Sequence, residues 1–151
     1  MALYSPRASG LGNSAAYQVA GKPFMTGSYV GNGGEVKIEF PFVAKSLTFY
    51  NTGSGGNQDA LKVTLVSAAD GQNGGAIAGN HVMPLFASNT NFDASVCSLK
   101  IEGKFKEIYV SDGSPNQQSQ GGFHLYPELT GIPASEMYEL SGSGVNTHGV
   151  G

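Results

Sequence analysis

The stretch EVKIEF, at residues 35–40, alternates strictly between charged and apolar side chains. In an extended chain this places Val36, Ile38 and Phe40 on one face and the charged side chains on the other. A period of two residues predicts a β-strand with one buried face. We expect this strand to end at Pro41, because proline has no N–H group to donate to a neighbouring strand.

Similar apolar stretches follow at short intervals and predict further strands, at residues 46–50, 61–65, 81–86, 95–102, 105–110 and 122–129. A single helix is expected over residues 132–140, where Pro133 suits the first helical turn. Many short strands with almost no helix predict the all-β class. We expect a single antiparallel β-sandwich or jelly roll with an extended N-terminal arm and one short C-terminal helix.

Composition narrows the class of protein. Of the 151 residues, 13% are charged and 23 are glycine, whereas roughly 25% are charged in ordinary globular domains. The net charge is −3 and the cations are scattered, so we expect no nucleic-acid partner. No apolar run is as long as a membrane span or the core of a signal peptide, so we expect no membrane association.

The two ends of the chain differ from its centre. Residues 1–22 mix Gly, Ser, Ala, Pro and Asn with isolated apolar side chains, and GSGVNTHGVG at 142–151 has almost no apolar residues. Such segments bury too little apolar surface to offset the entropy of ordering them. We predict an extended N-terminal arm at 1–22, a β-sandwich domain at 23–141 and a Gly-rich C-terminal tail at 142–151, with the ends ordered by a partner. The expected partner-binding residues are Leu3, Tyr4, Leu11, Tyr17, Val19, Phe24, Tyr138 and Val145.

Residues that could carry chemistry are few and scattered. Cys97 is the only thiol, and it shares a strand face with Leu99 and Ile101, which predicts a buried structural role. The three histidines, at positions 81, 124 and 148, lack the spacing typical of metal ligands. We therefore predict no catalytic residue, no metal, no cofactor and no enzymatic activity.

Two glycine-rich stretches, GNGG at 31–34 and GSGG at 53–56, could cradle a phosphate through backbone amides. Neither precedes an expected helix, and neither contains the Lys-Ser/Thr pair of a phosphate-binding loop. We interpret both as hairpin turns.

The aromatic residues leave two interpretations open. The chain has 7 Tyr and no Trp. Five tyrosines fall where the ring can lie on an apolar surface while the hydroxyl reaches a polar rim: Tyr29, Tyr50, Tyr109, Tyr126 and Tyr138. Tyrosine is enriched in protein interfaces, but packing at the edge of the core explains the same pattern.

Three stretches carry a resemblance to a known class of protein: GNSAAYQVAGKPFMTGS at 12–28, KEIYVS at 106–111 and LTGIPASEMYELSGSG at 129–144. They resemble segments of small virion structural proteins of marine tailed bacteriophages. The resemblance implies a capsid decoration or cement protein, often a trimer, whose terminal arms reach onto neighbouring shell subunits. It implies no catalytic residues.

The leading hypothesis is thus a non-enzymatic virion component, assembled in the host cytoplasm, that binds and stabilises the capsid shell. Its partners would be the major capsid protein or other virion proteins, together with further copies of itself, with a homotrimer favoured. The alternative is a carbohydrate- or receptor-binding β-sandwich module of a phage tail or fibre, using polar loops at residues 89–91 and 117–120.

Overall fold

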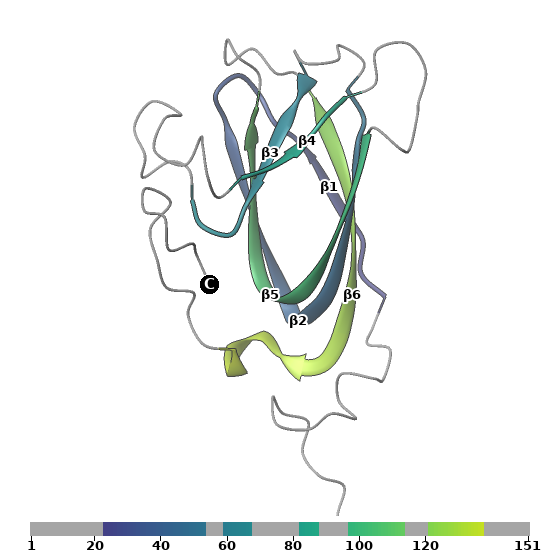
Figure 1. Ribbon diagram of the computed structural model, residues 1–151. Coiled ribbons are helices and arrows are strands. Elements are labelled where there is room, and N and C mark those ends of the chain that lie inside the picture. The colour runs from purple at the N-terminus through teal and green to yellow at the C-terminus, as the bar shows by residue number, and fades with distance from the viewer. Residues whose placement is uncertain (1–22, 54–58, 68–81, 88–96, 114–120, 138–151) are drawn as a thin grey trace, which may run out of the picture.

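The computed structural model describes residues 23–53, 59–67, 82–87, 97–113 and 121–137. This part of the chain is built almost entirely of β-strands, which confirms the predicted all-β class (Figure 1). The elements are β1 (Thr26–Tyr29), β2 (Glu35–Asn51), β3 (Leu61–Thr64), β4 (Met83–Leu85), β5 (Ser98–Asp112), β6 (Gly122–Pro133) and the 3₁₀ helix η2 (Ala134–Glu136).

The strands form one six-stranded sheet in the order β1-β6-β2-β5-β3-β4, and every neighbouring pair is antiparallel. β1 was not expected as a strand. It pairs with the start of β6, the last strand in the sequence, so the first and last strands of the described chain lie side by side.

Two long strands share a bend. β2 has 17 residues and β5 has 15, and Figure 1 shows both curving at the same end of the molecule. Residues 35–39 of β2 pair with 107–111 of β5, and after register shifts between Glu39 and Ser46, residues 46–50 pair with 98–102. The β2–β6 pairing shifts register over the same part of β2. The strands expected at 35–40 and 46–50 are therefore one strand, as are those expected at 95–102 and 105–110.

Pro41 corrects a prediction, because it does not end the strand. It lies inside β2, between Glu39 and Ala44, where the register with β5 is irregular. An irregular position needs no N–H donation to the ladder, so proline is tolerated there. Thr130 fixes the bend from β6, since its hydroxyl donates to the carbonyl oxygen of Val43 over 2.8 Å.

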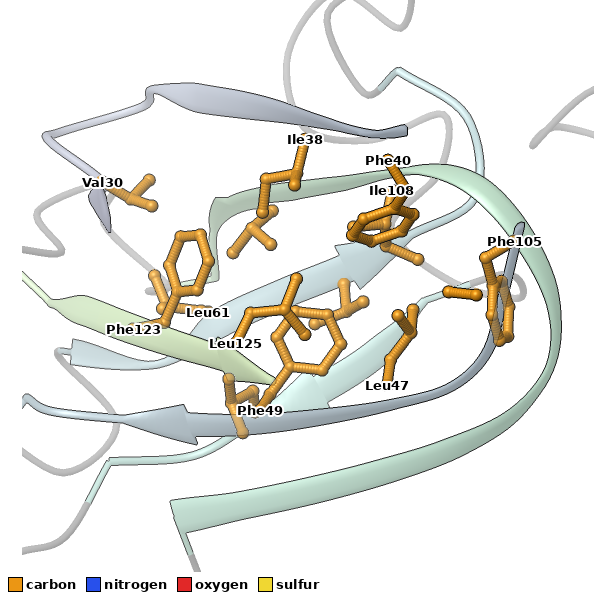
Figure 2. Packing of buried hydrophobic residues seen from close by; sticks show 14 of the residues in the cluster. Val30, Ile38, Phe40, Leu47, Phe49, Leu61, Phe105, Ile108, Phe123 and Leu125 are labelled. Carbon is orange, nitrogen blue, oxygen red and sulfur yellow. The ribbon is translucent and has the colours of Figure 1, made fainter. Parts of the chain in front are cut away.

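Buried side chains from both arms of the bent sheet meet in one core (Figure 2). Leu47 and Phe49 come from one side of the bend in β2, and Ile38 comes from the other. The rings of Phe49 and Phe123 pack at a centroid distance of 6.2 Å. The alternation in EVKIEF is reproduced in part: Ile38 and Phe40 are buried, while Val36 is half-buried against the core.

The helix expected over 132–140 is not formed by its described residues. β6 continues to Pro133, which pairs with Phe42, and only the 3₁₀ turn Ala134–Glu136 follows. Ile132 is fully buried, and its N–H donates to the hydroxyl oxygen of Thr130 rather than to a helical carbonyl. Tertiary pairing with β2 thus overrides the local helical pattern. Residues 138–140 lie outside the described part.

The GNGG stretch forms a turn, but not a hairpin. The N–H of Gly34 donates to the carbonyl oxygen of Gly31 over 2.8 Å, and Gly33 takes a φ of 63° that favours glycine. The flanking strands β1 and β2 are not neighbours in the sheet, so the expected hairpin is wrong. Instead, Asp112 of β5 accepts the Gly33 N–H at 2.9 Å through Oδ2.

Candidate binding surface

Three tyrosines lie exposed on the outer face of adjacent strands. Tyr29 of β1, Tyr126 of β6 and Tyr50 of β2 are 57%, 44% and 36% exposed. His124 of β6 lies among them, because it stands opposite both Gly27 and Tyr50 in the sheet register. We call Tyr29, Tyr50, His124 and Tyr126 the aromatic face.

Alternation in β6 creates this surface. Phe123 and Leu125 point into the core, as Figure 2 shows, so His124 and Tyr126 must point away from it. Residues that stand directly opposite each other in an antiparallel pair share a face, which places Tyr50 beside His124. The aromatic face is therefore a direct consequence of burying the apolar residues of β6 and β2.

A depression of about 510 Å³ opens at the β1 margin of the aromatic face. Its lining comes from β1, the end of β2 and the start of β6 and consists of Gly27, Ser28, Tyr29, Thr52, Gly122, Phe123 and His124. Gly27 stands opposite His124 and Gly122 stands opposite Tyr29, so each ring faces a residue without a side chain. The lining residues that the structure describes include no carboxylate, lysine or arginine.

Both glycines make room for a polar atom. A Cβ on Gly27 would lie 2.9 Å from Nδ1 of His124 and 2.6 Å from the carbonyl oxygen of Phe123. A Cβ on Gly122 would lie 2.9 Å from the hydroxyl oxygen of Thr52. The imidazole and the hydroxyl thus lie directly over the glycine backbones, at the floor of the depression.

Charged residues border the aromatic face beyond Tyr126. Glu128 pairs with Lys45 at 3.3 Å, and Lys100 pairs with Glu102 at 3.0 Å. The aromatic centre with a charged border is the composition expected of a protein interface.

The opposite outer face, on the other arm of the bent sheet, is charged instead. Lys37 Nζ lies 2.7 Å from Glu39 Oε1 and 2.9 Å from Glu107 Oε2, and it sits 5.9 Å from the ring centre of Tyr109. Partial burial acts to raise the pKa of Glu107, but hydrogen bonds from Lys37 and Tyr109 outweigh it and lower that pKa. The two carboxylates raise the pKa of Lys37. Each of these charges has a partner, which is typical of a structural ion-pair network.

Of the residues expected to bind a partner, the structure describes Phe24 alone. Its ring packs edge-on against Phe40 at a centroid distance of 6.2 Å, half-buried beside the core. Seven others lie outside the described residues: Leu3, Tyr4, Leu11, Tyr17, Val19, Tyr138 and Val145. The same holds for His81, for His148 and for the loops at 89–91 and 117–120.

The burial predicted for Cys97 is confirmed, since its side chain is fully enclosed. Within the described ranges, no three His, Cys, Asp or Glu side chains gather closely enough to hold a metal ion. The same ranges contain no helix that is long and apolar enough to cross a membrane.

Sequence reasoning did not identify Gly27, Thr52, Gly122 or His124 as members of one site. The alternation of apolar and polar residues over 122–129 is the signal in the sequence that could have separated His124 and Tyr126 from the core side chains. The pairing of β1 with β6 joins residues almost a hundred positions apart, and no local pattern encodes it.

Neither a protein-family model nor a curated protein sequence matches the chain.

Proposed function

We propose that the chain is a non-enzymatic virion structural protein of the decoration or cement type, which docks on a protein shell through its aromatic face. The supporting observation is the exposure of Tyr29, Tyr50 and Tyr126 on one surface of three adjacent strands. Tyrosine combines a large apolar ring with few rotatable bonds, so burying it in an interface costs little conformational entropy. The resemblance to phage virion proteins points to the same function.

The terminal segments and self-association complete the proposal. Residues 1–22 lead directly into β1, which borders the aromatic face, so an arm and this face could engage one partner surface together. A single arm binds modestly, because ordering it costs free energy. In a homotrimer three such surfaces act at once, and avidity exceeds the affinity of one by about 10²–10⁴.

The finer fold that we propose is a jelly roll, a form of β-sandwich. We count each half of the bent β2 and each half of the bent β5 as a separate strand. The strands then pair in a nested order: the first strand pairs with the last, the second pairs with the second last, and the innermost pair is β3 with β4. One sheet would contain β1, β6, the end of β2 and the start of β5; the other would contain the remaining segments. Jelly rolls are common in viral capsid and lectin domains, an analogy that supports the proposal without selecting a function.

The test is co-sedimentation of the purified protein with shells that lack it. Tyr126→Asp replaces an exposed ring of the aromatic face with a charge and should weaken binding at least about tenfold, since an unpaired charge is costly in an interface. Ser135→Asp adds the same charge to an exposed position of η2, outside the aromatic face, and should bind as the parent does.

Deletion of residues 1–22 tests the arm separately. We expect the shortened chain to fold, because the described core contains no residue before Phe24, and to lose shell binding. Undiminished binding by both Tyr126→Asp and the deletion variant would overturn the proposal.

A further inference from the structure

We propose that the depression between β1 and β6 is a binding site for a neutral saccharide, with Tyr29 as its stacking platform. This inference does not depend on the proposed docking function. It rests on which side chains line the depression and on which of their polar groups lack a hydrogen-bond partner within the described part of the chain.

The first step is the character of the lining. Tyr29 presents an exposed aromatic ring at the margin, and Thr52 and His124 place a hydroxyl and an imidazole at the floor. None of the described residues that line the site carries a carboxylate, ammonium or guanidinium group. A phosphate, a nucleotide or a strongly charged peptide would therefore find no countercharge, whereas an uncharged polyol needs none.

The second step is the state of the polar groups. Within the described part of the chain, the Tyr29 hydroxyl, the Thr52 hydroxyl and the His124 ring nitrogens have no hydrogen-bond partner, and Ser28 makes only a 3.4 Å contact with a neighbouring backbone oxygen. These groups offer both donors and acceptors. Sugar hydroxyls also donate and accept, so one ring with several hydroxyls could satisfy two or three of them at once.

The third step is shape. The glycines opposite Tyr29 and His124 let the imidazole of His124 and the hydroxyl of Thr52 lie close to the backbone, at the floor of a depression of about 510 Å³. The depression is shallow and open to solvent, so a ligand would lie on the sheet with one side exposed. The negative face of an aromatic ring attracts the polarised C–H groups on the apolar face of a pyranose. A short neutral oligosaccharide would thus place one ring on Tyr29 and its hydroxyls toward Thr52 and His124.

The experiment uses the full chain, isotope-labelled, and a panel of neutral mono- and disaccharides of glucose, galactose, mannose and N-acetylglucosamine. NMR titration should reveal at least one sugar that shifts the resonances of Gly27, Gly122 and the His124 ring together. Tyr29→Ala should weaken that binding at least about tenfold. Tyr126→Ala is the matched control, because this tyrosine is similarly exposed on the same face but does not line the depression.

Two results would overturn the inference. One is the absence of localised shifts with every sugar at millimolar concentration. The other is binding that Tyr29→Ala and Tyr126→Ala weaken equally. A proline-rich peptide titrated in parallel, if it alone shifts these resonances, would instead assign the depression to protein recognition. Because this assay contains no shell, its failure leaves the shell-binding result unaffected.

Discussion

Asn51, the last residue of β2, donates through Nδ2 to the carbonyl oxygen of Leu85 in β4 over 3.1 Å. β2 and β4 are not neighbours in the sheet order, so this bond joins two distant strands across the bent sheet. The same amide donates to the carbonyl oxygen of Asp59 at 2.8 Å, and its oxygen accepts the N–H of Gly53 at 2.8 Å. With 1% exposure, Asn51 is a buried polar residue whose amide group is fully used.

Asn51→Ala should therefore destabilise the protein by about 2–3 kcal/mol, because it leaves buried backbone groups without partners. Denaturant unfolding followed by circular dichroism measures this loss. Asn32→Ala, at an exposed turn position, is the control and should change the free energy of unfolding by less than about 0.5 kcal/mol. Equal stability of the two variants would show that the Asn51 network contributes nothing.

Gly33 provides a test of backbone conformation. Gly33→Ala should cost about 1 kcal/mol, because its φ of 63° is unfavourable for a residue with a Cβ. Gly31→Ala lies in the same turn, lacks a positive φ and would meet only a Tyr29 ring carbon at 3.8 Å, so it should be close to neutral. Thermal unfolding of the two variants checks the difference, and identical melting temperatures would contradict it.

The ion pair of Lys37 and Glu107 predicts a pH dependence. The pKa of Glu107 is lowered in the folded protein, so its contribution to stability is present above the ordinary glutamate pKa and is lost as the pH falls through the folded value. Lys37→Gln should raise the pKa of Glu107 toward its ordinary value, as measured by NMR titration of its carboxyl carbon. It should also reduce stability slightly at neutral pH but not in strong acid.

Lys100→Gln is the control for this titration, because Lys100 pairs with Glu102 and not with Glu107. It should leave the Glu107 titration unchanged. A Glu107 pKa that is the same with and without Lys37 would refute the assignment.

Cys97 should be inert in the native state. Its side chain is fully buried, so a thiol reagent must wait for the structure to open. We expect modification by Ellman's reagent to be at least about a hundredfold slower in buffer than in guanidinium chloride. Rapid stoichiometric modification of the native protein would mean that the chain just before β5 opens easily.

Two elements show why sequence reasoning succeeded in one place and failed in another. Residues 122–129 alternate so regularly that their strand and its two faces could be predicted. Residues 132–137 carry helical signals, yet they extend β6 and form a 3₁₀ turn, because pairing with Phe42 and burial of Ile132 outweigh local propensity. The candidate site combines both cases. Alternation within one strand predicts which of its residues point outward, but it does not predict which other strand will pair with it.

By itself, the sequence determined the all-β class, the burial of Ile38 and Phe40 and the burial of Cys97. These features depend on residues two positions apart, and the side-chain period of an extended chain is fixed by covalent geometry. Only the tertiary structure decided that β2 and β5 continue through a bend, that β1 pairs with β6 and that Tyr29 and His124 border one depression. Those relationships join residues far apart in the chain, and it is the burial of the shared apolar core that selects among the possible pairings.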